Sequence, residues 1–164
     1  MLRRRRRAWD EQPTNPCEVL LASDGRKAFS QRAVAQAAAL SHSAPAAVVT
    51  IAKIYGTQYG FPHPGLLPTK QEMAERSGWV EDAIHELRRR GIEADGQIAA
   101  TRKGRKKIAA IARVRGVHVV VIDETESTGL RRLIEGDLGR DLRRTLRRDG
   151  ITVEIVPRGA GAET

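Results

Sequence analysis

The sequence predicts an α/β domain built on a parallel sheet, and three observations support this. Short apolar runs of strand length alternate along the chain with longer segments of helical periodicity. The runs are apolar at successive positions, which is typical of strands covered on both faces. The strands and helices also alternate one for one, and such chains form parallel sheets through right-handed crossovers.

The first half of the domain contains two predicted strands and two predicted helices. They are a buried strand at 17–23, a helix at 28–41, a strand at 46–52 and a long helix at 71–91. Asp24 and Gly25 follow the first strand as a turn. The loop 53–69 is rich in glycine and proline and contains three aromatic residues. It is interpreted as a loop packed on its own aromatics, with a lid over the ligand end of the sheet as the alternative.

The second half continues the alternation. It comprises a weak strand within 92–101, a helix at 104–116, the clearest strand at 117–123, a loop or the start of a helix at 124–135, a last helix at 136–148 and a fifth strand at 151–156. Ligands of such sheets bind beyond the carboxyl ends of the strands, at a topological switch point. The loops that follow the strands are therefore the places where a functional site is expected.

Length and composition bound the function. The 164 residues fit one domain, expected at 17–157, between a disordered polybasic arm at 1–16 and a flexible tail at 158–164. The net charge is +9, and five of the positive charges lie in the arm, at Arg3, Arg4, Arg5, Arg6 and Arg7. No apolar run approaches the ~20 residues of a membrane span, and no secretory signal is recognisable. The single cysteine, Cys17, excludes an intramolecular disulfide framework, so we expect a reducing, cytoplasmic location.

Three stretches of this chain resemble the universal stress protein family. They are VLLASDG at 19–25, VHVVVID at 117–123, and the closing loop, helix and strand at 127–157. The likeness covers roughly residues 18–157. It implies an open, Rossmann-like sheet of five parallel strands in the order 3-2-1-4-5, with helices on both faces. It also implies a homodimer, formed in many members through the last strand.

One group of that family binds ATP through a signature of G-x-x-G, nine residues and G-[S/T] after the fourth strand. Its positions fall here on Asp123, Glu126, Gly136 and Asp137, so two glycines and the hydroxyl residue are replaced by carboxylates. Glycines let backbone N–H groups reach phosphate oxygens, whereas carboxylates repel them. Two unit charges ~4 Å apart interact with about 4 kcal/mol at an effective dielectric of roughly 20. The departure predicts that ATP binding is lost.

The resemblance also assigns the positions at which a nucleotide would bind if any still does. They are Asp24, Gly25, Asp123, Glu126, Thr128, Gly129, Gly136 and Asp137. Asp24 lies where nucleotide-binding members contact the adenosine end of the ligand. An Asp-Gly pair after a strand is also ordinary turn chemistry.

The predicted function is that of a universal stress protein-like, non-catalytic protein in stress adaptation, which acts as a homodimer on an unidentified protein partner without a cofactor. One alternative is a regulatory domain that binds ATP with Mg²⁺, where the cation offsets the carboxylates. Another is binding of nucleic acid or an anionic surface through Arg3–Arg7. A metal-dependent hydrolase has only the acidic group Asp24, Asp123, Glu124, Glu126 and Asp137 in its favour, and no metal site is predicted.

The remaining charged and titratable residues are interpreted as surface or packing groups. Cations gather at the start of the helix 104–116, where a phosphate-bearing ligand is the alternative to an exposed helix face. In the last helix, Asp137–Arg140 and Asp141–Arg144 have the spacing of surface ion pairs. The four histidines show no ligand spacing.

Overall fold

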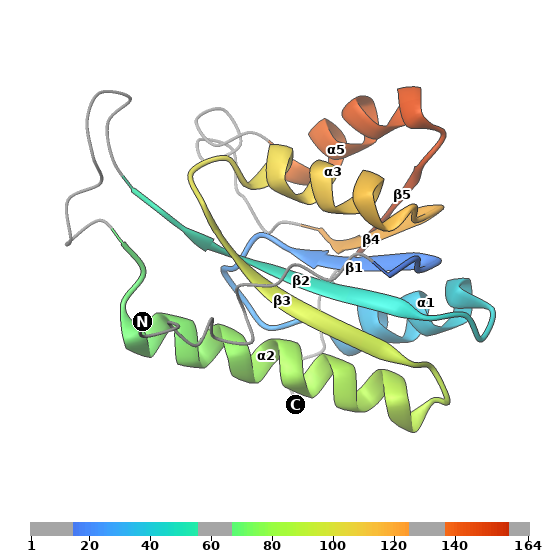
Figure 1. The fold of residues 1–164 in the computed structure, drawn as a ribbon, viewed down its shortest axis with the longest axis horizontal. Coiled ribbons are helices and arrows are strands. Elements are labelled where there is room, and N and C mark those ends of the chain that lie inside the picture. Colours follow the sequence, from blue (N-terminus) through green and yellow to red (C-terminus); the bar gives the residue numbers. More distant parts are fainter. Residues whose placement is uncertain (1–14, 56–66, 125–136, 158–164) are drawn as a thin grey trace, which may run out of the picture.

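A computed structural model of the chain describes residues 15–55, 67–124 and 137–157 (Figure 1). Five strands form one parallel sheet in the order β3-β2-β1-β4-β5. The predicted fold class and strand order are therefore confirmed. The elements are, in chain order, β1 (Val19–Ser23), α1 (Gln31–Ser41), β2 (Ala46–Lys53), α2 (Lys70–Arg89), β3 (Ala94–Thr101), α3 (Gly104–Arg115), β4 (Val119–Asp123), α5 (Leu138–Leu146), the 3-10 turn η2 (Arg147–Asp149) and β5 (Thr152–Val156).

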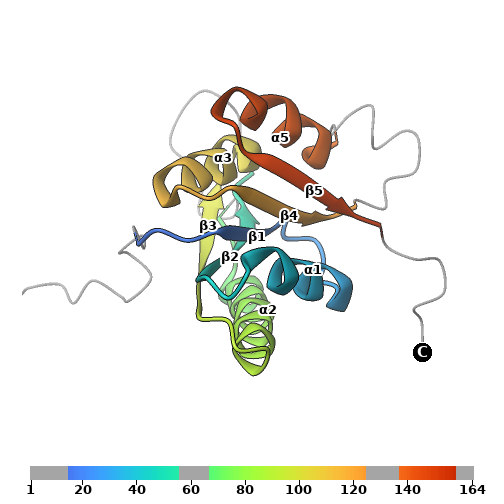
Figure 2. The same ribbon diagram turned by 90° about the vertical axis from the view of Figure 1, so that its right-hand side faces the viewer.

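The helices cover the sheet in two layers. Helices α1 and α2 pack on one face, and α3 and α5 pack on the other (Figure 2). Every residue of β1 is buried, because this strand is central and apolar on both faces. Leu87 of α2 and Leu142 of α5 are both fully buried, one in each core. Each such side chain contributes about 1.5–3 kcal/mol through its removal from water.

Three helix boundaries differ from the sequence prediction, and local hydrogen bonds explain each difference. Helix α1 begins after Ser30, because the Ser30 hydroxyl oxygen accepts from the backbone N–H of Ala33 at 3.0 Å. Helix α2 begins at Lys70, behind a capping box in which Thr69 and Glu72 satisfy each other's backbone N–H groups. The last turn of the chain's final helix tightens into η2.

Strand β3 is longer and more regular than its sequence indicates. Its eight residues pair with all of β2, although Asp95, Gly96 and Gln97 interrupt the apolar pattern. Gly96 has a packing role: a Cβ there would lie 2.4 Å from Cγ1 of Val80. The missing side chain thus lets α2 approach the sheet closely, and the contact with α2 compensates for the weak strand pattern.

An arginine covers the free edge of the sheet at β5. The backbone N–H of Thr152 donates to the carbonyl of His118 at 2.9 Å, so this peptide group faces β4. The alternation of a strand then points the Val153 carbonyl outward. Arg143 of α5 donates to that carbonyl from Nε at 3.3 Å and from Nη2 at 3.0 Å. Side chains over an edge are one way in which proteins limit strand addition.

Near the amino-terminal ends of the strands, a buried arginine joins three elements. Arg115 is 2% exposed and binds Asp95 with two guanidinium nitrogens, at 2.9 and 2.7 Å, while its Nε donates to the carbonyl of Asn15. The bond to Asp95 raises the pKa of Arg115. Beside it, burial raises the pKa of the Cys17 thiol. The end of α3 is thereby tied to the starts of β1 and β3.

Among the helices that the structure describes, none is both long and apolar enough to cross a membrane.

Candidate functional site

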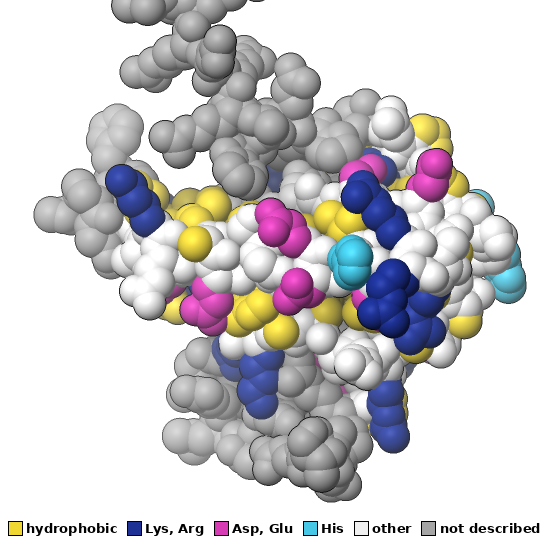
Figure 3. Space-filling view, turned by 90° about the horizontal axis from the view of Figure 1, so that it is seen from below, with side chains coloured by type: hydrophobic (Ala, Val, Ile, Leu, Met, Phe, Trp, Pro, Cys, Tyr) yellow, Lys and Arg dark blue, Asp and Glu magenta, His cyan; other side chains and the backbone are white. Residues whose placement is uncertain are grey.

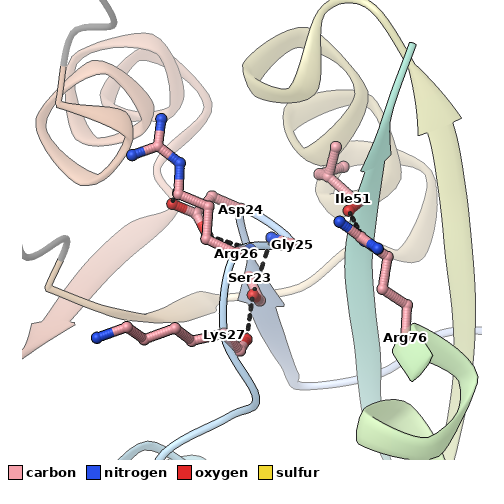
Figure 4. Close-up of polar contacts among 7 residues, drawn as sticks. All are labelled: Ser23, Asp24, Gly25, Arg26, Lys27, Ile51 and Arg76. Atoms are coloured by element: carbon pink, nitrogen blue, oxygen red, sulfur yellow. Dashed lines mark hydrogen bonds and ion pairs between the residues drawn. The ribbon is translucent and has the colours of Figure 1, made fainter. Parts of the chain in front are cut away.

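The carboxyl ends of β1, β2 and β4 meet at one edge of the sheet, as the parallel topology requires. The loop 23–27 leaves this edge after β1, beside Ile51 of β2 (Figure 4). Asp123 ends β4 next to the same loop, because Ala22 and Ile122 are register partners. The structure therefore brings the predicted site residues Asp24, Gly25 and Asp123 to one edge.

The loop after β1 is held by its own polar groups. The Ser23 hydroxyl accepts from the backbone N–H of Gly25 at 3.1 Å and donates to the carbonyl of Lys27 at 3.4 Å. Asp24 Oδ1 accepts from the backbone N–H of Arg26 at 3.0 Å, and Oδ2 lies 3.7 Å from Nε of Arg26. The carboxylate that the resemblance assigns to an adenosine contact is thus engaged within its own turn.

Gly25 fixes this loop against the neighbouring strand. Its φ is +83°, and a Cβ at this position would lie 1.7 Å from the carbonyl oxygen of Ile51. The same oxygen accepts a hydrogen bond from Nε of Arg76, on α2, at 3.1 Å (Figure 4). The Ile51 carbonyl is therefore enclosed by the loop on one side and by a guanidinium on the other. Only glycine fits here, for both its backbone angle and its size.

Asp123 binds the start of α1. Its Oδ2 accepts from the backbone N–H of Ser30 at 2.9 Å, and its Oδ1 accepts from the Ser30 hydroxyl. The same hydroxyl caps α1 through Ala33. A carboxylate at a helix N-terminus is stabilised by the helix dipole as well as by these bonds. The residue at the first glycine position of the ATP signature therefore joins β4 to α1.

Asp137 has a comparable role on the other face. It is the N-cap of α5, where Oδ1 accepts from the backbone N–H of Arg140 at 3.4 Å. Its Oδ2 lies 3.6 Å from Nε of Arg140, so the predicted pair is confirmed. Asp141 and Arg144, the second predicted pair, form no ion pair between their side chains.

Two residues of this edge were missed by the sequence reasoning. Ser30 was placed inside a helix, although a serine before an alanine-rich run is a typical N-cap signal. Thr50 is fully buried beside Ser23 in the register, and within the described residues its hydroxyl has no hydrogen-bond partner. Nothing in the apolar run 46–52 marks that hydroxyl as unpaired.

The other predicted site residues lie outside the described residues. They are Arg3, Arg4, Arg5, Arg6, Arg7, Glu126, Thr128, Gly129 and Gly136. Within residues 15–55, 67–124 and 137–157, no three His, Cys, Asp or Glu side chains are grouped so as to hold a metal ion.

Comparison with known proteins identifies the fold. No family model and no curated protein matches the sequence. The chain is similar in structure to a universal stress protein from Archaeoglobus fulgidus, with a TM-score of 0.59 and 15% identity over 85% of this chain and 93% of that one. It is also similar to a member of the family from Burkholderia pseudomallei, with a TM-score of 0.55 and 18% identity over 86% and 96%.

A universal stress protein solved in complex with cAMP gives a TM-score of 0.59 at 15% identity, covering 88% of this chain and all of that one. The Archaeoglobus fulgidus protein has also been solved in complex with dAMP, with a TM-score of 0.56 and 16% identity over 85% and 96%. At such identities the likeness is one of fold. The domain described here has the universal stress protein fold, as the sequence resemblance predicted.

Proposed function

We propose that this chain is a non-catalytic, universal stress protein-like protein of stress adaptation, which acts in the cytoplasm as a homodimer and does not bind ATP. The observation that carries the proposal is the position of the Asp123 carboxylate. It ends β4, where the resemblance places the first glycine of the ATP signature, and it is bound to the cap of α1. The buried, unpaired thiol of Cys17 is compatible with a reducing compartment.

The chemistry of that position opposes a polyphosphate. A glycine would leave its backbone N–H open to a phosphate oxygen, whereas Asp123 adds a side chain and a negative charge. The carboxylate cannot turn away without breaking its two bonds to Ser30, each worth about 1 kcal/mol or more. Asp24 is likewise engaged by Arg26. These contacts support the proposal that the carboxylates of Asp24 and Asp123 stabilise the fold and do not bind a nucleotide.

Calorimetric titration of the full chain with ATP, with and without Mg²⁺ at moderate salt, tests this proposal. We expect no saturable heat and no thermal stabilisation in either condition. One-to-one binding without Mg²⁺ would overturn the assignment of Asp123 as a residue that excludes ATP. The variant with Asp123→Gly, Glu126→Gly and Asp137→Ser recreates the signature, and it gains binding if these side chains are what excludes the nucleotide.

A nucleotide-binding regulator is the second candidate, and the solved neighbours favour it. Two of them hold adenine nucleotides with a single phosphate group, dAMP and cAMP. Asp24 and Gly25 are retained, and a ligand of this size presents less charge to Asp123 than ATP does. The same titration with AMP and cAMP separates the candidates. If ATP binds only with Mg²⁺, the carboxylates act as cation ligands and this second function replaces the first.

The homodimer is proposed through the edge strand β5. Among the described residues, Arg143 alone is hydrogen-bonded to the outward peptide groups of Val153 and Ile155, and the remaining groups could pair with a second copy. Pairing through this edge therefore requires Arg143 to swing away. Replacing Arg143 by alanine should tighten the dimer in sedimentation equilibrium. An unchanged dissociation constant would place the interface elsewhere, and a monomer at all concentrations would overturn the homodimer.

A further inference from the structure

The face of the sheet covered by α3 and α5 carries a marked excess of positive charge. The two helices lie side by side in both views of the fold (Figures 1 and 2). Residues 103–115 and 137–149 contribute ten Lys or Arg side chains that are exposed or half-exposed, against three carboxylates. The ten are Lys103, Arg105, Lys106, Lys107, Arg113, Arg140, Arg143, Arg144, Arg147 and Arg148. We call this surface the α3/α5 face.

The opposite side of the molecule lacks this excess. Helix α2 and its C-cap hold five cations and five carboxylates, and α1 adds a single arginine. Figure 3 looks onto the side that bears α2 and shows both acidic and basic side chains on it. Arg89 and Arg90 there both pair with Glu86. The positive charge of the described domain is thus a property of one face rather than of the whole surface.

A hollow of about 400 Å³ lies between α3 and α5 and is lined mainly by arginine. Arg113, Arg144, Thr145, Arg148 and Asp149 surround it. Asp149 forms an ion pair with Arg113, and the distance from Asp149 Oδ2 to Arg113 Nε is 2.9 Å. Among the described residues, Arg144 and Arg148 have no carboxylate partner. Two guanidinium groups therefore remain to meet an anion in this hollow, and the planar fork of arginine suits phosphate oxygens.

Several of these cations lie at positions where they lower the stability of their own helices. Helix α3 carries Lys103, Arg105 and Lys106 at its N-terminal end and no acidic residue in its first turn. Cations there oppose the helix dipole, which favours negative charge at this end. In α5, Arg140 and Arg144 stand one turn apart, about 6 Å along the axis, where like charges repel. An anionic partner would relieve both arrangements.

We infer that the α3/α5 face binds the phosphate backbone of duplex nucleic acid without reading its sequence. Single strands are held largely by stacking on aromatic side chains, and neither 103–115 nor 137–149 contains an aromatic residue. A membrane surface calls for apolar side chains that enter it, and Val114 is the only large hydrophobic residue exposed on these helices. Rows of cations beside a hollow instead match the regular charge of a duplex.

The test is binding of the full chain to a fluorescein-labelled, mixed-sequence DNA duplex of about 20 base pairs, measured by anisotropy at several salt concentrations. In the variant Arg144→Gln/Arg148→Gln we expect affinity to fall by about tenfold or more near 0.1 M salt. The slope of log K against log [salt] should shrink by about 2, near one unit for each lost phosphate contact. Both arginines are exposed, so the melting temperature should stay within a few degrees.

The variant Arg89→Gln/Arg90→Gln removes the same charge from α2 and is the matched control. It should keep the wild-type affinity and slope, because the binding face is unaltered. An equal loss in both variants would mean that net charge alone binds the duplex, and this would overturn the assignment. An unchanged Arg144→Gln/Arg148→Gln variant would leave the polybasic arm as the binder. Binding to phosphatidylglycerol vesicles but not to the duplex would also overturn it.

Discussion

The two faces of the sheet are built from similar apolar cores but differ in how they use polar groups. On the side of α1 and α2, polar contacts point inward and anchor the helices: Asp123 binds the cap of α1, and Arg76 of α2 binds the Ile51 carbonyl. On the side of α3 and α5, the helices are held mainly by aliphatic packing. Exposed arginines there outnumber the carboxylates. Two arginines are exceptions there: Arg115 is buried with Asp95, and Arg143 donates to the Val153 carbonyl.

This difference separates residues that hold the fold from residues that are free to meet a partner. Replacing a charged group that has a directional bond to the backbone lowers the stability of the protein. Replacing an exposed charged group that has no carboxylate partner does not. Substitutions on the α1/α2 side should therefore lower the free energy of unfolding. Those on the α3/α5 face, apart from Arg143 with its bond to the Val153 carbonyl, should change binding and leave the free energy of unfolding almost unaltered.

The largest effect is expected at Gly25, which packs directly against the Ile51 carbonyl that Arg76 of α2 also binds. The variant Gly25→Ala should lose about 3 kcal/mol or more in urea denaturation, from left-handed strain and the collision with the Ile51 carbonyl. Gly91→Ala is the control, since its φ of +80° is similar and a Cβ there meets nothing within 4 Å. It should lose only about 1 kcal/mol. Equal losses would show that the Ile51 contact is unimportant.

Next comes the buried exception on the α3 side. Asp95→Asn leaves the Arg115 guanidinium buried without its carboxylate, and we expect a loss of about 2 kcal/mol. This is below the roughly 3–5 kcal/mol of fully buried pairs, because Asp95 is partly exposed. Asp149→Asn, which unpairs the exposed Arg113, should cost less than about 0.5 kcal/mol. Thermal unfolding of the two variants side by side measures the difference, and similar melting temperatures would contradict it.

A smaller loss is expected where β4 meets α1. Asp123→Ala removes both contacts to Ser30 and should lower the free energy of unfolding by about 1–2 kcal/mol. Hydrogen exchange should rise in the first turn of α1. Replacing the adjacent, exposed Glu124 by alanine should leave both measurements unchanged, and a loss as large as that of Asp123→Ala would contradict the capping role.

The smallest effect concerns alkaline pH. Burial raises the pKa of the Cys17 thiol, so the folded chain keeps the thiol proton at a pH where the unfolded chain has lost it. Stability from this source is complete below the unfolded pKa and is lost as pH rises toward the folded pKa, by at most about 1.4 kcal/mol per pH unit. Urea denaturation at several alkaline pH values should show a smaller loss in Cys17→Ala. An identical decline in both proteins would exclude the thiol.

The fold could be predicted because its signals are local or cumulative. Continuous apolar runs such as 19–22 and 117–122 identify buried parallel strands, and the alternation with helices leaves few topologies. The strand order came with the family resemblance. Strand β3 was underrated, because Gly96 weakens the local pattern while its effect comes from Val80 of α2, which no local pattern reveals.

The candidate site was predictable in place but not in detail. The parallel topology brings Asp24, Gly25 and Asp123 to one edge, as expected for residues that end or follow parallel strands. That Asp123 bonds to Ser30, 93 positions away, depends on a long-range contact. The burial of Arg115 was missed for the same reason, because a helix-terminal arginine is ordinarily exposed and only the folded chain places Asp95 beside it.

The contact between Asp123 and Ser30 also bears on how this sequence can change over generations. Any replacement small enough to open the end of β4 to a ligand removes both bonds at once, and stability falls before anything is gained. Natural proteins lie only a little above the stability they need, so selection would act against this first step unless another substitution came earlier. The hydrogen-bonded carboxylate of Asp123 therefore adds a stability cost to any substitution that would place a glycine at the end of β4.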